Sequence, residues 1–222
     1  RPATGAFSAN LLSGLYSYLP RSGSTLITSL LNQRSDVYMP FQSPLVEILH
    51  RSNFLWSDQD FEIEVSASDI AKLRVKAVSG ICNGFCSAVT TKPVFIDKHW
   101  CWALEPNLKL ADEVVPNIKV LRTWRSPSEI RKSFVKCGFV YSEARLQEIL
   151  TAHSRLVELE DYRVFSIHFD EIQDDITSVM SRIEKWFDLS PYDYDIKKPS
   201  VDSGITDRIL GSTVLHELRA SA

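Results

Sequence analysis

The sequence predicts a three-layer α/β domain with a central, mainly parallel sheet. Short apolar runs that end in polar or charged residues alternate along the chain with segments whose apolar residues recur at helical spacing. Such an alternation requires crossover connections, which make neighbouring strands parallel and place helices on both faces of the sheet. A length of 222 residues suits one domain, and no repeat or linker divides it, so residues 1–222 are expected to form a single domain.

Five short apolar runs are expected to be the strands of this sheet. Each is bounded by turn residues or charges, and the last alternates so that every second side chain is apolar. The five runs are 15–19, 36–39, 93–97, 118–124 and 163–169.

The helices are predicted from apolar residues three and four positions apart. In the segment 24–33 they are Leu26, Ile27, Leu30 and Leu31, which share one face. The same spacing predicts further helices over 43–52, 68–88, 145–159 and 176–187. Ligands of open parallel sheets sit beyond the carboxyl ends of the strands, so the charged strand ends are the places to search for a site.

Composition narrows the possible partners and the compartment. A formal net charge of -3 offers no global basic field for nucleic acid or an anionic membrane, so neither partner is expected. No apolar run approaches the ~20 residues that a membrane-spanning helix needs, and no segment resembles a cleavable signal. A cytoplasmic location is therefore favoured, although the chain begins at Arg1 rather than at Met, which leaves open an earlier leader or anchor.

The four cysteines do not form a disulfide framework in a chain of this size. Cys82 and Cys86 are four residues apart, a spacing that metal ligands on one helix face also use. No second matching pair accompanies them, which favours buried free thiols and no metal site.

The stretch "PRSGST", Pro20–Thr25, follows the first apolar run and leads directly into a helix. Gly23 permits a backbone conformation closed to other residues, while Ser22, Ser24 and Thr25 carry hydroxyl groups. The helix start adds unpaired N–H groups and a positive dipole end, and Arg21 adds a permanently charged fork for oxyanions. These features predict an anion-binding turn, but no lysine precedes the Ser/Thr as it does in nucleoside-triphosphate loops.

A second candidate, "RSPSEIRKS", follows the apolar run 118–124. Ser126 is predicted to cap a helix, with Pro127 at its first position and Glu129 completing a capping box. Arg125 is thereby placed at a strand-to-helix junction, and Ser133 lies eight residues later on the second turn of the helix. A guanidinium and a hydroxyl arranged in this way can hold one phosphate from two sides.

The two stretches "YLPRSGSTLI" and "RSPSEIRKS" together resemble the cofactor signatures of sulfotransferases that use 3′-phosphoadenosine 5′-phosphosulfate (PAPS). The likeness continues in "IDKHW" and "YRVFSIHFDEIQDDITSVMSRIEKWFDLS" and covers about Tyr16–Leu189. It implies a P-loop-like fold in which Arg21–Thr25 binds the 5′-phosphosulfate, and Arg125 with Ser133 binds the 3′-phosphate. The implied reaction moves a sulfuryl group to a hydroxyl or amine without a metal ion.

The general base is the point at which the sequence departs from its relatives. Where protein-tyrosine sulfotransferases carry a Glu, this chain has Gln42, which cannot act as a base. His99 follows a strand end, as the catalytic His of cytosolic sulfotransferases does, and is the first choice; Glu47 and Asp97 are the alternatives. The resemblance also makes Lys98 a candidate for contacting the leaving oxygen.

Several alternatives stay open at this stage. Arg122 and Arg131 compete with Arg125 as phosphate ligands. A small P-loop-type nucleotide kinase shares the layout, with Asp97 as a possible magnesium ligand, and a non-catalytic nucleotide-binding module would explain Gln42. The acceptor is a small molecule, a carbohydrate or a peptide. The segments from 41 to 91 and beyond Pro191 are expected to shape its pocket, and the sequence does not define the oligomeric state.

Overall fold

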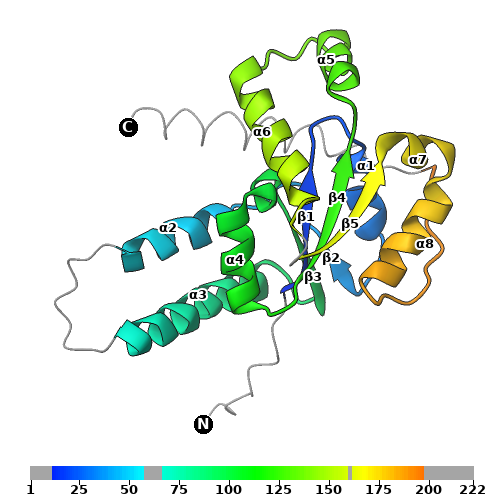
Figure 1. Ribbon diagram of the computed structural model, residues 1–222. Coiled ribbons are helices and arrows are strands. Elements are labelled where there is room, and N and C mark those ends of the chain that lie inside the picture. Colours follow the sequence, from blue (N-terminus) through cyan, green and yellow to red (C-terminus); the bar gives the residue numbers. More distant parts are fainter. Residues whose placement is uncertain (1–11, 58–66, 160–161, 198–222) are drawn as a thin grey trace.

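The computed structural model describes residues 12–57, 67–159 and 162–197, and its five strands form one all-parallel sheet (Figure 1). The strands follow the order β2-β3-β1-β4-β5, and each overlaps one of the predicted runs. Their bounds are β1 (Leu12–Tyr18), β2 (Val37–Tyr38), β3 (Val94–Lys98), β4 (Lys119–Trp124) and β5 (Arg163–His168). The predicted α/β fold with a central parallel sheet is confirmed.

Helices cover both faces of the sheet, which gives the three predicted layers (Figure 1). One face carries α1 (Ser24–Leu31) and α8 (Ile176–Trp186), with the short α7 (Phe169–Asp174) before α8. The other face carries α2 (Leu45–Ser57), α3 (Ala67–Val89), the 3₁₀ helix η1 (Trp100–Ala103), α4 (Glu105–Val114) and α6 (Glu143–Leu156). Helix α5 (Pro127–Lys136) follows β4 at the carboxyl end of the sheet.

Three of these helices were not predicted, and the last predicted strand runs into a helix. The sequence patterns did not indicate η1, α4 or α7. Phe169 was placed in the last strand, but it opens α7. His168 ends the strand because its Nδ1 accepts the Asp170 N–H at 3.3 Å, while its own N–H donates to the Glu171 carboxylate at 2.8 Å. This reciprocal cap starts a helix at once.

The sheet separates two hydrophobic cores. Leu15 and Val120 contribute to a core with α3, α4 and α6, whereas Tyr16 and Leu121 face α1 and α8. The side chains of successive strand residues point to opposite faces, so these neighbours serve different cores. Cys82, Cys86 and Cys101 are buried free thiols as predicted, but Cys137 is exposed.

The strand order creates a crevice at the carboxyl edge of β1. From β1 the chain runs outward to β2 and returns to β3, and only then crosses to β4 and β5 on the other side. Connections that leave adjacent strands in opposite directions open a crevice between them, where ligands of such sheets bind. The predicted phosphate loop, which follows β1, lies at this point.

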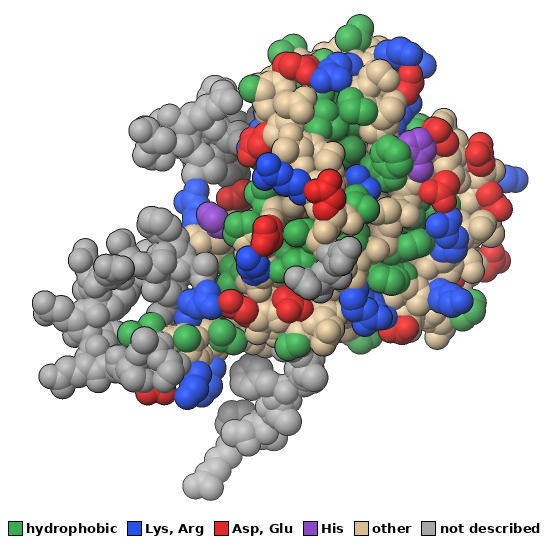
Figure 2. Space-filling model, viewed as in Figure 1, with side chains coloured by type: hydrophobic (Ala, Val, Ile, Leu, Met, Phe, Trp, Pro, Cys, Tyr) green, Lys and Arg blue, Asp and Glu red, His purple; other side chains and the backbone are tan. Residues whose placement is uncertain are grey.

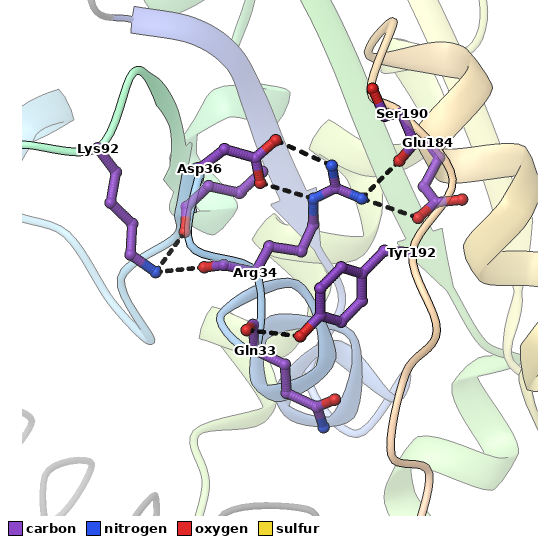
Figure 3. Close-up of polar contacts among 8 residues, drawn as sticks. Gln33, Arg34, Asp36, Lys92, Glu184, Ser190 and Tyr192 are labelled. Carbon is purple, nitrogen blue, oxygen red and sulfur yellow. Dashed lines mark hydrogen bonds and ion pairs between the residues drawn. The ribbon is translucent and has the colours of Figure 1, made fainter.

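A buried ion pair fastens the segment after α8 to the far end of α1 (Figure 3). Arg34 follows α1 and is 3% exposed; its guanidinium binds Asp36 through two bonds of 2.9 Å and reaches Glu184 at 3.0 Å. It also donates to the Ser190 carbonyl at 2.7 Å, while the Tyr192 hydroxyl donates to the carbonyl of the residue before Arg34 at 2.9 Å. These contacts set the position of α1 and therefore of the loop at its other end.

None of the helices within the described residues is both long and apolar enough to cross a membrane.

Candidate active site

The loop between β1 and α1 has the backbone of an anion cradle. Arg21 and Gly23 both have left-handed backbone conformations, with φ angles of 61° and 83°. Gly23 precedes α1, whose first turn receives no side-chain cap, so its leading N–H groups point out of the helix without a side-chain acceptor. Ser24 is buried and Thr25 is exposed at this helix start. Such a terminus attracts anions through its N–H groups and its dipole.

Ser22 points away from this cradle and into the protein. Its hydroxyl is fully buried and donates to the Leu19 carbonyl at 2.6 Å. The same oxygen lies 2.8 Å from Thr123 Oγ1, which is 3.0 Å from the Tyr16 hydroxyl. Ser22 thus ties the loop to β1 and β4 through its side chain, and only its backbone N–H is left for an anion.

The structure brings Arg21, Arg125 and Ser133 together at the mouth of the loop. Arg21 Nε donates to Ser133 Oγ at 2.9 Å, and its Nη2 lies 3.3 Å from Cys137 Sγ. Arg125 Nη1 donates to the Arg21 carbonyl at 3.1 Å, and its guanidinium stacks 4.0 Å from the centre of the Phe169 ring. Two arginines and one hydroxyl from separate elements therefore face the same space.

The competing arginines are engaged elsewhere. Arg131 pairs with the Glu143 carboxylate through Nε at 3.1 Å. Arg122 is buried under α6, donates to Ser166 Oγ at 3.4 Å and has its pKa lowered to about 10 by burial. Of the three candidates, only Arg125 contacts the loop.

The predicted cap of α5 is half correct. Ser126 accepts the Glu129 N–H at 3.4 Å and starts the helix, with Pro127 at its first position. The Glu129 carboxylate does not return the bond; it pairs with Lys132 at 2.7 Å and lies 3.7 Å from Arg125 Nη2. Two opposite charges within reach attract the carboxylate more strongly than one amide does.

Asp97 and Lys98 are the last two residues of β3. Both are buried, but their side chains have different surroundings. Asp97 Oδ2 accepts the Trp102 indole N–H at 2.7 Å, and burial raises the pKa of this carboxyl to about 6. The Lys98 ammonium lies over aromatic rings, 4.8 Å from the centre of Tyr18 and 5.8 Å from that of Phe41. Lys98 pairs with Tyr16 in the sheet and so lies at the same edge as the loop.

His99 is held as a neutral hydrogen-bond donor. Its Nδ1 accepts the Cys101 N–H at 3.1 Å and caps η1, which requires the ring proton to sit on Nε2. Burial, with a contribution from Arg145, lowers its pKa to about 4, so the ring is uncharged near pH 7. A ring in this tautomer offers a proton at Nε2 rather than a lone pair.

Glu47 reaches the same place from the first turn of α2. One of its carboxylate oxygens, a ring nitrogen of His99 and Cys101 Sγ all lie within 4.8 Å of one another. Glu47 is exposed, whereas His99 and Cys101 are buried. Glu47 and His99 are far apart in the sequence, so no sequence pattern predicted that they lie close together. Their proximity depends on the packing of α2 against η1 and α4.

The fold is an α/β domain in which β1 leads through a tight turn into α1, whose N-terminus has no side-chain cap. The chain belongs to the sulfotransferase family, because the model of the sulfotransferase family matches residues 19–194. Members of this family are enzymes that transfer sulfuryl groups from PAPS, so the prediction of such an enzyme is confirmed at the level of the family. No curated protein sequence matches the chain significantly.

Solved structures of sulfotransferases share the fold. The sulfotransferase domain from the Synechococcus PCC 7002 olefin synthase superposes with a TM-score of 0.60 at 17% identity, covering 85% of this chain and 77% of that one. The sulfotransferase domain from the curacin biosynthetic pathway gives 0.57 at 18% identity, covering 86% and 79%. A sulfotransferase from Alicyclobacillus acidocaldarius gives 0.50 at 14% identity, covering 82% and 84%.

Proposed function

We propose that this chain moves a sulfuryl group from PAPS to a hydroxyl or amine, with the nucleotide held between the loop and α5. The observation that carries the proposal is the convergence of Arg21, Arg125 and Ser133 at the uncapped start of α1. Arg125 Nε is buried and has no hydrogen-bond partner among the described residues, so a donor is available there for a phosphate oxygen.

Two groups of residues at this position are proposed to bind the two phosphate-bearing ends of the nucleotide. The N–H groups of Ser22–Thr25 and the Arg21 guanidinium would bind the 5′-phosphosulfate, and Arg125 with Ser133 would bind the 3′-phosphate. Bound PAPS supplies the sulfuryl group and a phosphate leaving group. Arg21, Lys98 and the α1 N-terminus would stabilise negative charge on the departing phosphate, because fixed donors and dipoles act there without reorganisation. No step is assigned to a metal ion.

Three groups were candidates for the base, and the geometry favours Glu47. Asp97 is fully buried, and its carboxylate accepts a hydrogen bond from the Trp102 indole. His99 carries its proton on Nε2, so it can donate to the acceptor or to a carboxylate but cannot accept there. Glu47 is an exposed carboxylate next to His99. We therefore assign proton removal to Glu47 and orientation to His99, in place of the sequence-based choice of His99 as base.

The chemical step then balances as follows. An acceptor oxygen or nitrogen forms a bond to sulfur while the bond from sulfur to the 5′-phosphate oxygen breaks. The acceptor proton passes to Glu47, and the phosphate leaves with the electron pair. On the face shown in Figure 2, positive and negative side chains are interspersed, which supports a small-molecule, carbohydrate or peptide acceptor over nucleic acid.

Ligand stabilisation tests the nucleotide site. We expect 3′-phosphoadenosine 5′-phosphate to raise the melting temperature more than ADP or ATP with magnesium, since a ligand bound only by the folded state stabilises it. Arg125→Ala should weaken the binding of 3′-phosphoadenosine 5′-phosphate by about 2–3 kcal/mol. The control is Arg131→Ala, which removes an α5 arginine that pairs with Glu143 and should leave the binding unchanged. Stronger stabilisation by ATP with magnesium would support a kinase and refute the proposal.

Turnover of variants tests the base. Glu47→Gln should lower the rate of sulfuryl transfer by about 10²–10⁴-fold with nucleotide affinity unchanged, which is the usual contribution of a general base. The control is Glu105→Gln, because Glu105 occupies the first turn of α4 as Glu47 does that of α2. If His99→Gln loses this much activity while Glu47→Gln keeps it, His99 is the base. Nucleotide binding without transfer to any acceptor would indicate a non-catalytic module.

A further inference from the structure

The cluster of Glu47, His99 and Cys101 combines three kinds of metal-ligating atom, one from α2 and two from η1 and its N-cap. The ligand atoms lie within 4.8 Å of one another. Zinc binds oxygen, nitrogen and sulfur at about 2.0–2.3 Å, which separates neighbouring tetrahedral ligands by between about 3 and 4 Å. The cluster therefore needs a closure of only about 1 Å to surround one ion.

Two of the three ligands are fixed by the backbone, and the third is free to adjust. The His99 N–H donates to the Tyr16 carbonyl at 3.0 Å, and the Cys101 carbonyl accepts from Asn107 at 2.9 Å. Glu47 is an exposed residue of α2 whose longer side chain has several rotamers. A rotation of Glu47 can thus bring its carboxylate toward the ring and the thiol without moving the strand end.

The ligand types select the ion. Calcium and magnesium prefer sites made only of oxygen, whereas a thiolate with an imidazole and a carboxylate suits zinc and cobalt. His99 is already in the tautomer with a lone pair at Nδ1, so an ion there replaces the 3.1 Å bond from the Cys101 N–H. The Cys101 thiol loses its proton when it binds, as thiol ligands do.

The surrounding charge is compatible with a cation. Arg145 is the basic group whose field reaches both His99 and Cys101. Its guanidinium is occupied, because it pairs with Glu148 at 2.6 Å and lies 4.3 Å from the centre of the Trp100 ring. Glu148 and Glu47 together supply two negative charges, which outweigh the single positive charge of Arg145.

We propose that Glu47, His99 and Cys101 form a site for a zinc-like divalent ion, and that the bound ion inhibits sulfuryl transfer. Inhibition follows because the carboxylate that coordinates the ion can no longer accept the acceptor's proton. This second part depends on the assignment of Glu47 as base, whereas the metal site itself does not. Cys101 takes no part in the proposed chemistry, so it can be changed to separate the two.

Cobalt titration of the purified full chain tests the site directly. We expect a thiolate-to-cobalt charge-transfer band, unchanged in Cys137→Ser, which removes the exposed thiol. Cys101→Ser should abolish the band and weaken cobalt binding about tenfold or more. Glu47→Gln alters an exposed side chain, so it should fold normally, keep the band and bind more weakly. A band that persists in Cys101→Ser, or its absence from the wild type, overturns the metal site.

Zinc inhibition completes the test. Zinc should inhibit transfer by the wild type, and Cys101→Ser should keep its metal-free rate while resisting zinc. Equal inhibition of both proteins refutes the inhibitory role. If the cobalt band appears but no acceptor is sulfated, the metal site is supported and the proposed function is wrong. If transfer occurs but no band appears, the proposed function is supported and the metal site is wrong.

Discussion

Replacement of Asp97 by Asn should change how stability depends on pH. Asp97 is fully buried, and its pKa rises from 3.8 to about 6, chiefly through burial. The folded protein thus keeps this proton to higher pH than the unfolded chain does. The stabilising contribution is complete below pH 3.8, declines as pH rises to about 6 and then stays low. A rise of the Asp97 pKa from 3.8 to about 6 corresponds to about 3 kcal/mol over the whole window.

Urea denaturation at about pH 4.5 and about pH 7.5 measures this effect. Asp97→Asn has no charge to lose, so its stability relative to wild type should increase by about 2 kcal/mol from the lower to the higher pH. Burial lowers the pKa values of His99 to about 4 and His153 to about 3, but both residues are present in both proteins and cancel in the difference. Exposed Asp193→Asn is the control and should show no such increase. A difference for Asp97→Asn that is independent of pH would refute the reasoning.

Two further substitutions test the loop and its support. Gly23→Ala forces a side chain into a φ of 83° and should cost about 1–2 kcal/mol of stability and weaken binding of 3′-phosphoadenosine 5′-phosphate. Gly138→Ala has a similar φ of 67°, but its added Cβ meets nothing within 4 Å, whereas a Cβ at Gly23 would lie 2.9 Å from Ile172 Cδ1. It should therefore cost less stability and leave binding of the nucleotide unchanged; equal weakening of binding would contradict a role for the loop. Arg34→Met should cost about 3–5 kcal/mol in urea denaturation because Glu184 stays buried with its partner removed. Adding Glu184→Leu should recover part of that loss, and a purely additive result would argue against the pair.

The sequence was sufficient to predict the sheet and the meeting of the loop after β1 with the residues after β4. Apolar runs mark the strands, and the residues that follow β1 and β4 meet because parallel strands end at one edge. Arg21 was predicted from one stretch and the pair of Arg125 and Ser133 from another, and the structure joins the two stretches by direct hydrogen bonds. Their roles in binding PAPS stay predictions.

The other end of the site could not be predicted because it depends on tertiary packing. Glu47 is far from Cys101 along the chain, and no local pattern places α2 beside η1. The tautomer of His99 depends on one bond from the Cys101 N–H, which exists only because a 3₁₀ turn follows the strand. The inward direction of the Ser22 hydroxyl likewise depends on Thr123 in β4.

The hydrogen bonds between the last described segment and the end of α1 determine where the protein can be truncated. The Asp195 N–H donates to Gln33 Oε1 at 2.8 Å, and the Gln33 amide returns a bond to the Asp195 carbonyl at 3.0 Å. The family match ends at 194 and begins at 19, after β1. An excised or fused version trimmed to the match would lose both the central strand and this clasp. Boundaries for protein engineering should therefore follow the contacts, from Leu12 or earlier to beyond Asp195.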